Sequence, residues 1–286
     1  MRLPAQLLRR KRDSNKGDFG HILIIAGSPR YSGAAVLTAK ASLRSGAGLV
    51  TLAIPKSLNN AVIKIKPLEA MILPLPETRD GFLSLSGFKK IADFPADVIA
   101  IGPGLDRDKS TFALARKVIS KVGKPMVIDA DGLTALNGHL KILRAGGLTG
   151  KRATIMTPHP GEMARLLKVN VKEVQKNRKS IAARFAKIHK VTLVLKGANT
   201  IVADHKGSAY INKTGNPGMS TAGCGDVLTG MIAAFLGQGL SAFDAAKYGV
   251  YLQGLAGDIA AKEKTQISLI ASDIIAKIPE AIKRCS

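Results

Sequence analysis

The sequence is short of several residue types, and each shortage excludes a class of protein. It contains no tryptophan, 4% aromatic residues and only two cysteines, Cys224 and Cys285. Two cysteines are too few for a disulfide framework, so we expect a reducing compartment, the cytoplasm. No apolar run approaches the ~20 residues that a membrane-spanning helix needs. The N-terminal residues also lack the apolar segment of a secretory signal, and we therefore expect no membrane association.

Acidic residues are few as well. The 286 residues include 43 Lys and Arg against 20 Asp and Glu, which gives a net charge of +23. A surface this basic attracts anions such as nucleotides, phosphates or nucleic acid. The sequence has none of the RNP motifs, zinc modules or stacking aromatics that nucleic-acid-binding proteins commonly show. We therefore expect small polyanionic substrates and no nucleic acid. Residues 1–15 are expected to form a flexible basic N-terminal arm.

Short apolar runs alternate with amphipathic stretches along the chain, without an internal repeat or a low-complexity linker. The apolar runs are typical of parallel strands buried on both faces, and they lie at residues 21–26, 49–54, 97–101, 125–129, 153–157 and 191–195. Helices are expected at residues 32–45, 108–122, 171–190, 223–237, 241–264 and 272–284. This alternation predicts a single α/β domain over residues 1–286 with a central, mostly parallel sheet.

Turns rich in glycine or proline follow five of the expected strands, at residues 26–33, 101–105, 129–133, 157–162 and 196–200. Each turn alone is ordinary loop punctuation. In open parallel sheets, however, ligands bind at the carboxyl ends of the strands. Five such turns in phase with strand ends therefore predict a broad crevice along one edge of the sheet.

The strongest local signal is the glycine-rich segment NKTGNPGMSTAGCGDVLTG at residues 212–230, which leads into an apolar helix. It is not a Walker A loop, because it lacks the GxxxxGK[ST] pattern. The first N–H groups of a helix have no internal acceptor, and with the helix dipole they form an anion site. Glycine lets the backbone approach a phosphate closely. The predicted anion hole is the backbone of Ala222, Gly223, Cys224 and Gly225.

Asp226 follows directly, in the first turn of the expected helix. An acidic residue is ordinary at a helix N-terminus because it complements the helix dipole. The alternative is a general base that faces a hydroxyl beside the anion hole. A carboxylate next to a phosphate site repels the phosphate unless it has a chemical role. We therefore interpret Asp226 as the catalytic base.

The Gly-x-Gly-Asp pattern at residues 223–226 resembles the anion-hole motif of the ribokinase-like superfamily. Most of the chain resembles the ADP/ATP-dependent NAD(P)H-hydrate dehydratases of that superfamily. The matching segments lie at residues 16–52, 101–105 (IGPGL), 127–133 (VIDADGL), 157–162 (TPHPGE), 195–200 (LKGANT) and 214–231. The family more often has Ser, Thr or Gly at the position of Cys224, a departure that leaves the backbone role intact. The resemblance implies a three-layer α/β/α fold.

The resemblance also implies the reaction. NAD(P)H that is hydrated at C6 of the nicotinamide ring would be dehydrated, with ADP or ATP as phosphoryl donor. Phosphorylation of the C6 hydroxyl creates a good leaving group, and the ring nitrogen then expels phosphate. Mg²⁺ is expected to bridge the nucleotide phosphates, and its protein ligands are not identified. The resemblance also implies that the protein forms a homotetramer. The sequence lacks the epimerase domain that some relatives carry upstream, so we expect no epimerisation.

The ligand contacts that the resemblance implies fall on the turns at the strand ends. The nucleotide is expected to contact Gly225 and the turn formed by Lys196, Gly197, Ala198, Asn199 and Thr200. The hydrated cofactor is expected to contact Asp226 and four further residues, namely Ala34, Ala35, Gly104 and His159. Close packing of helix on strand is an equal alternative for the two alanines and Gly104.

Three other carboxylates and the choice of reaction stay open. Glu162 either caps the helix that follows it or orients magnesium or water. Asp129 or Asp131 serves either a metal or its own loop. A kinase of a small vitamin-type alcohol, such as hydroxyethylthiazole, would need the same anion hole and the same base. The segments TPHPGE and IGPGL together favour the dehydratase over this alternative.

Overall fold

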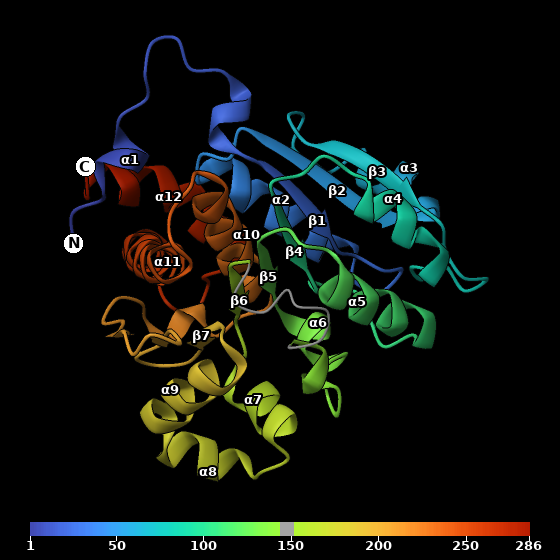
Figure 1. Ribbon diagram of the computed structural model, residues 1–286. Helices are drawn as coiled ribbons and strands as arrows, with labels where there is room; N and C mark the ends of the chain where they lie inside the picture. The colour runs from blue at the N-terminus through green and yellow to red at the C-terminus, as the bar shows by residue number, and fades with distance from the viewer. Residues whose placement is uncertain (144–151) are drawn as a thin grey trace.

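The computed structural model describes residues 1–143 and 152–286, and its centre is a sheet covered by helices on both faces (Figure 1). The strands within these residues are β1 (His21–Ile25), β2 (Leu49–Pro55), β3 (Met71–Leu75), β4 (Val98–Ile101), β5 (Met126–Ile128), β6 (Thr154–Met156), β7 (Thr192–Leu195), β8 (Ile201–Ala203) and β9 (Ala209–Ile211). Their order is β3-β2-β1-β4-β5-β6-β7-β8-β9. The strands from β3 to β7 pair in parallel, whereas β8 and β9 are antiparallel to their neighbours.

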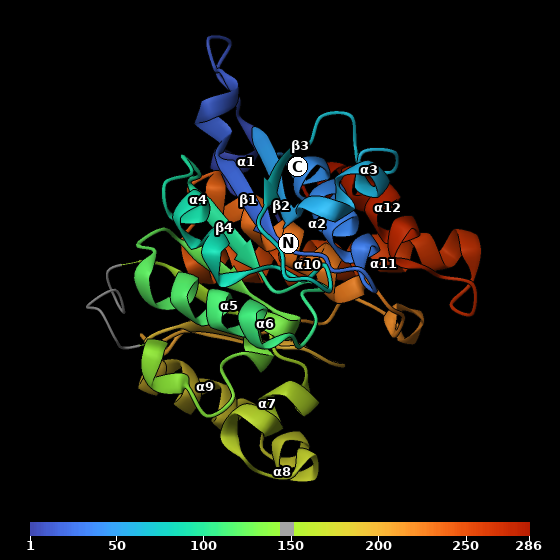
Figure 2. The same cartoon turned by 90° about the vertical axis from the view of Figure 1, so that its right-hand side faces the viewer.

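The helices divide into two layers, one on each face of the sheet. They are α1 (Ala5–Leu8), α2 (Ser32–Arg44), α3 (Asn59–Val62), α4 (Phe88–Ala92), α5 (Lys109–Lys121), α6 (Ala130–Thr134), α7 (Pro160–Leu167), α8 (Val171–Lys176), α9 (Arg178–His189), α10 (Cys224–Gly237), α11 (Ala242–Lys264) and α12 (Ala271–Lys283). Figure 2 shows α5, α6, α7 and α9 on one side of the strands and α2, α10, α11 and α12 on the other. The predicted three-layer α/β/α architecture is therefore confirmed.

Both faces of the central strands are buried, which explains their unbroken apolar sequences. Successive side chains of a strand point to opposite faces. Ile22 and Ile24 of β1 accordingly pack in the cluster that contains α2, α10 and α12. Leu23 and Ile25 pack in the second cluster, with α5, α7 and α9. All four side chains are at most 1% exposed, so neither face of the strand is polar and the sequence does not alternate between apolar and polar residues.

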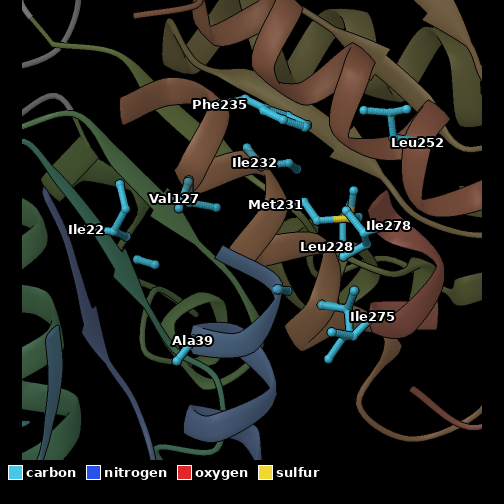
Figure 3. Packing of buried hydrophobic residues seen from close by; sticks show 14 of the residues in the cluster. Ile22, Ala39, Val127, Leu228, Met231, Ile232, Phe235, Leu252, Ile275 and Ile278 are labelled. Carbon is cyan, nitrogen blue, oxygen red and sulfur yellow. The ribbon is translucent and has the colours of Figure 1, made fainter. Parts of the chain in front are cut away.

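Helix α10 lies at the centre of one layer, and this position fixes where its first turn meets the sheet. Every residue from 227 to 236 is buried. Figure 3 shows Leu228, Met231 and Phe235 among side chains of α2, α11 and α12. A helix that is apolar on all sides is stable only when it is covered on all sides. The N-terminus of α10 is thus held rigidly at the carboxyl edge of the strands.

Two expectations about secondary structure need correction. Strand β3 was not predicted, because Pro74 interrupts its apolar run; it lies at the edge of the sheet, where proline is tolerated. The single helix expected at residues 171–190 is two helices, α8 and α9, separated at Asn177. The backbone of Asn177 is not helical, with φ −122° and ψ 28°, and Asn competes with the helix for its own backbone groups.

The N-terminal segment is packed rather than free, which corrects the expected flexible arm for residues 3–10. Leu3 is 5% exposed, and its N–H donates to the carbonyl of Cys285 at 2.8 Å. Arg10 donates to the carbonyl of Gly46 at 2.9 Å and lies over the ring of Phe19. Both termini therefore lie at the same side of the molecule (Figure 1). Within the described ranges, no helix combines the length and the apolar character that crossing a bilayer requires.

Helices α2 and α10 touch through a glycine, and this contact gives a stability prediction. A Cβ added at Gly230 would lie 2.3 Å from the carbonyl oxygen of Thr38 and 2.9 Å from Cβ of Ala41. Gly230→Ala is therefore expected to lower the free energy of unfolding by about 1–3 kcal/mol through overpacking. Gly33→Ala is the control, because a Cβ there meets nothing within 4 Å.

Alanine favours the helix more than glycine does, so the Gly33→Ala control should leave stability unchanged or raise it by at most about 1 kcal/mol. Urea unfolding of both variants measures the difference. Equal stabilisation by the two substitutions would show that the close α2–α10 contact is absent in solution.

Candidate functional site

The carboxyl edge of the sheet gathers the polar residues that the sequence placed after separate strands. Asp129 follows β5, His159 follows β6, and Lys196 follows β7. The first turn of α10, which carries Asp226, reaches the same edge, because α10 packs against β4 and β5. The edge at which the sequence predicted a crevice thus carries one cluster of charged groups.

The ammonium group of Lys196 is the centre of this cluster. Its Nζ lies 2.7 Å from Oδ1 of Asp129 and 3.9 Å from Oε2 of Glu162. The second oxygen of Asp129 accepts a hydrogen bond from the hydroxyl of Thr229 on α10, at 2.8 Å. The side chain of Asp129 is 1% exposed, so this carboxylate depends on its two partners. In the sequence, Asp129 and Asp131 were equal candidates for a role at this strand end. Thr229 was not predicted, because it lies within an apolar helical segment.

The predicted anion hole has the geometry of an open helix N-terminus. Gly223 caps α10 with φ +88°, a left-handed conformation that glycine adopts freely. Among the described residues, no protein atom accepts a hydrogen bond from the N–H groups of residues 222–226. The carbonyl of Cys224 is held by the side chain of Gln253 on α11. The free donors and the positive end of the helix dipole therefore face the same side, as an anion site requires.

Lys196 lies directly beside this anion hole. A Cβ added at Gly225 would be 3.3 Å from Nζ of Lys196 and 3.5 Å from Oδ2 of Asp129. The absence of a side chain at Gly225 is thus what lets the ammonium approach the start of α10. A phosphate bound by the helix N–H groups would meet a fixed positive charge at this point.

Asp226 is a carboxylate whose ionisation is suppressed by its surroundings. Burial raises the pKa of Asp226 to about 7, and the negative charge of Asp129 acts in the same direction. Lys196 opposes these effects, and Asp131 adds to them. A group with a pKa near the working pH is suited to accept a proton and to release it again. The raised pKa of Asp226 therefore suits the predicted role of general base, which stays a prediction.

His159 and Glu162 form a reciprocal cap at the start of α7. Nδ1 of His159 accepts from the backbone N–H of Gly161 at 3.0 Å, and Oε2 of Glu162 accepts from the N–H of His159 at 2.8 Å. Of the two roles left open for Glu162, the structure contains the helix cap. Burial also raises the pKa of Glu162 to about 7, against the opposing charge of Lys196. Burial, together with Lys196, lowers the pKa of His159, so its imidazole is neutral at pH 7.

The turn at residues 196–200 presents an exposed backbone next to the anion hole. Gly197 has φ +126° and Asn199 has φ +54°, and the hydroxyl of Thr200 donates to the carbonyl of Gly197 at 2.8 Å. Gly197, Ala198 and Asn199 are exposed. The turn is also contacted by Arg178 of α9, a residue that gave no signal in the sequence because it resembles any solvated charge of a basic helix.

The residues expected to contact the hydrated cofactor through α2 are only partly available. Ala35 is 0% exposed and packs in the core, so its side chain is not available to a ligand, and a contact through its backbone stays a prediction. Ala34 is partly exposed. A Cβ added at Gly104 would lie 2.6 Å from the carbonyl oxygen of Tyr31 and 2.9 Å from Cβ of Ala34. Gly104 therefore permits close packing of two loops, the alternative that the sequence left open.

The loops after β1, β4 and β5 are tied together by charged side chains. The guanidinium of Arg30 binds both oxygens of Asp106 at 2.8 Å. The N–H of Asp106 donates to Oδ2 of Asp131 at 2.9 Å. Asp131 thus stabilises the neighbouring loop, which is one of the two roles considered for it.

The described residues contain no group of three or more His, Cys, Asp or Glu side chains placed to hold a metal ion. Magnesium is commonly bound through one or two carboxylates together with waters and substrate phosphates. The oxygens of Asp129 are occupied by Lys196 and Thr229, whereas Oε1 of Glu162 has only the 3.6 Å contact with His159. The site therefore fits a magnesium ion that arrives with a nucleotide, and does not fit a resident metal held by protein groups alone.

Comparisons with known proteins identify the relatives of this chain. The profile of the family described as NAD(P)H-hydrate dehydratase matches residues 22–280. The bifunctional NAD(P)H-hydrate repair enzyme Nnr of Moorella thermoacetica is 44% identical over 282 residues, which are 98% of this chain and 52% of that protein. The ADP-dependent (S)-NAD(P)H-hydrate dehydratase of Neisseria meningitidis serogroup B is 37% identical over 277 residues, 96% of this chain and 88% of that protein.

A solved structure shows the same architecture. The ADP/ATP-dependent NAD(P)H-hydrate dehydratase from Bacillus subtilis, co-crystallized with ATP/Mg²⁺, superposes with a TM-score of 0.83 at 31% identity, covering 100% of this chain and 95% of that one. The fold thus defines a ribokinase-like protein, and its site contains a helix N-terminus whose backbone N–H groups have no acceptor among the described residues. Within that class, the chain belongs to the NAD(P)H-hydrate dehydratase family. It spans about half the length of the bifunctional relatives that it matches.

The position of Lys196 between two carboxylates predicts a change in their titration. Lys196→Met removes the positive charge that lowers the pKa of both Glu162 and Asp226. Each pKa is therefore expected to rise above about 7 by one pH unit or more. Carboxyl ¹³C NMR titration measures both. Lys213→Met, which removes an exposed lysine from the neighbouring loop, is the control and should leave both values in place.

Proposed function

We propose that this chain dehydrates the hydrated forms of NADH and NADPH, in the S configuration, with ADP or ATP as phosphoryl donor. The observation that carries the proposal is the pairing of a free helix N-terminus with Lys196 and with the raised pKa of Asp226. Phosphoryl transfer needs fixed donors for the moving group and a base for the attacking hydroxyl. The family and its ADP-dependent members support the assignment of the acceptor.

The residues of this chain have distinct parts in the proposed reaction. The carboxylate of Asp226 accepts the proton of the C6 hydroxyl while that oxygen forms a bond to the terminal phosphorus. The bond from this phosphorus to the donor nucleotide breaks, and AMP or ADP leaves. The N–H groups of residues 222–225 and the ammonium of Lys196 stabilise the charge on the transferred group. The Gly197–Thr200 backbone binds the remaining nucleotide.

Loss of phosphate completes the dehydration. The lone pair of the ring nitrogen expels phosphate as the C6–O bond breaks, and the proton on the adjacent C5 leaves to restore the dihydropyridine. His159, which is neutral and half exposed at the same edge, is proposed to contact the hydrated ring. Ala34 and the backbone near Gly104 are proposed to lie along the same ligand. Magnesium, held by the nucleotide phosphates with Glu162, would neutralise phosphate charge.

The alternative reaction, phosphorylation of a small vitamin-type alcohol, would use the same anion hole and the same base. The two functions differ in the acceptor, and the family profile covers residues 22–280 with the dehydratase description. Two relatives that are 44% and 37% identical to this chain over the aligned residues are named as an NAD(P)H-hydrate repair enzyme and an ADP-dependent (S)-NAD(P)H-hydrate dehydratase. These similarities support the dehydratase over the kinase.

We also propose a homotetramer in the cytoplasm. Apolar side chains next to the edge strand β3 support association, since Ile63 is 54% exposed and Leu68 is 93% exposed. An unpaired strand edge beside apolar side chains is a surface that proteins commonly cover.

The reaction is tested directly by incubating the protein with hydrated NADH, magnesium and either ADP or ATP. Recovery of the NADH absorbance band, with equimolar release of phosphate, is the expected result. Turnover of hydroxyethylthiazole or a related alcohol, without recovery of NADH, would instead establish the kinase.

Replacement of the proposed base should separate chemistry from binding. Asp226→Asn keeps the size of the side chain and removes the proton acceptor, so kcat should fall by roughly 10²–10⁴-fold. Binding of ADP, measured by calorimetry, should stay within a few-fold, because the anion hole is backbone. Activity close to that of the unaltered protein would show that another group takes the proton.

The raised pKa of Asp226 sets the direction of the pH dependence. Because the base must be ionised, kcat/KM should increase as the pH rises through about 7 and should level off above it. Glu162 titrates in the same range, so the profile is repeated with Glu162→Gln. The acid limb should persist in that variant. Its disappearance would assign the ionisation to Glu162 instead.

A further inference from the structure

The exposed turn proposed to bind the nucleotide receives three backbone hydrogen bonds from one side chain of a different element. Arg178 is the first residue of α9, and its Nη2 donates to the carbonyls of Leu195 at 3.0 Å and Lys196 at 3.1 Å. Its Nη1 donates to the carbonyl of Ala198. The carbonyl oxygens on both sides of Gly197 are thus directed at one guanidinium.

This contact fixes which backbone groups of the turn face outward. In a trans peptide, the N–H of a residue points opposite to the carbonyl of the residue before it, and the described chain has no cis peptide bond. Because the carbonyls of Lys196 and Ala198 point to Arg178, the N–H groups of Gly197 and Asn199 point away from it. In the described part of the chain, neither N–H group donates to a protein acceptor.

Gly197 gives the guanidinium the room that it needs. Its φ of +126° belongs to the region that favours glycine, and an added Cβ would lie 3.2 Å from Nη2 of Arg178. The turn and the arginine are therefore matched: a side chain at position 197 would both strain the backbone and press on the guanidinium.

The arginine also leaves its charge uncompensated. Within the described residues, no carboxylate forms an ion pair with Arg178, and its Nε is buried without a hydrogen-bond partner. Burial lowers the pKa of Arg178. A partly buried cation that meets only carbonyl dipoles among the described residues has a desolvation cost that no carboxylate offsets. Beneath a turn with outward N–H groups, the same positive charge attracts an anionic ligand.

We propose that Arg178 is a positioning residue for the nucleotide: by holding the carbonyls of residues 195, 196 and 198, it directs the N–H groups of Gly197 and Asn199 toward the bound donor. The inference rests on the proposed function, because it assigns Arg178 to the nucleotide half of that site. Arg178 acts through the backbone of the turn. A turn that is already in its binding conformation avoids the entropy cost of ordering on binding.

The test is calorimetric titration of the full chain with ADP. Arg178→Lys keeps the charge and cannot reach three carbonyls, and Arg178→Gln removes the charge too. Both are expected to weaken ADP binding by about tenfold or more, whereas inorganic pyrophosphate, which needs only the anion hole, should bind within about threefold of the unaltered protein. Arg184→Gln is the matched control, because it removes an exposed arginine of the same helix and should change nothing.

Turnover adds a readout that general structural damage would not produce. In Arg178→Lys the KM for ADP should rise, while the KM for hydrated NADH stays constant. Gly197→Ala disturbs the same contact from the turn itself and tests the inference if the arginine variants fail to fold. Its effect on ADP affinity should be large and should not add to that of Arg178→Gln.

The outcomes separate this inference from the proposed function. Normal ADP affinity in Arg178→Lys, or in Gly197→Ala, would overturn the role of Arg178 and leave the proposed function in place. Failure of the unaltered protein to bind either ADP or ATP would overturn the proposed function and this inference with it.

Discussion

The site depends on one ammonium group that is shared among carboxylates. Lys196 contacts Asp129 and Glu162 and lies within electrostatic reach of Asp226. Burial alone would lower the pKa of Lys196, but these carboxylates outweigh burial and raise it, so the lysine stays charged. In return the lysine keeps three acidic groups in a buried space that would otherwise repel one another. The charge of Lys196 is therefore required to keep these carboxylates together. The same charge lies next to the predicted anion hole.

The same ammonium connects two segments that have little else in common. The first turn of α10 provides unpaired backbone donors, and the turn after β7 provides an exposed backbone held from below. Thr229 and Asp129 link α10 to β5, and Lys196 links β5 to β7. A distortion of any of these elements would change the separation between the two turns. The buried helix α10 thus fixes the position of its own first turn relative to the turn after β7.

The sequence identified the parts of the fold that depend on local patterns. Unbroken apolar runs marked the buried parallel strands, and the glycines at residues 223 and 225 marked the open start of α10. Contacts between distant segments had no such pattern. Asp129 and Lys196 are separated by 67 positions, and only the register of β5 against β7 through β6 brings them together. The burial of the Ala35 side chain was not visible in the sequence for the same reason, since the helix face that points inward depends on what covers it.

The contact between Leu3 and Cys285 has a consequence for the topology of the chain. The two segments meet through a backbone hydrogen bond, so a short peptide could join the residues on either side of it into a ring. New ends could then be opened at the exposed turn around Gly207, where an added Cβ would meet nothing within 4 Å. Such a circular permutant would have the same segments in a different order along the chain. It would keep all three layers of the fold, because the joined ends already lie close together in space.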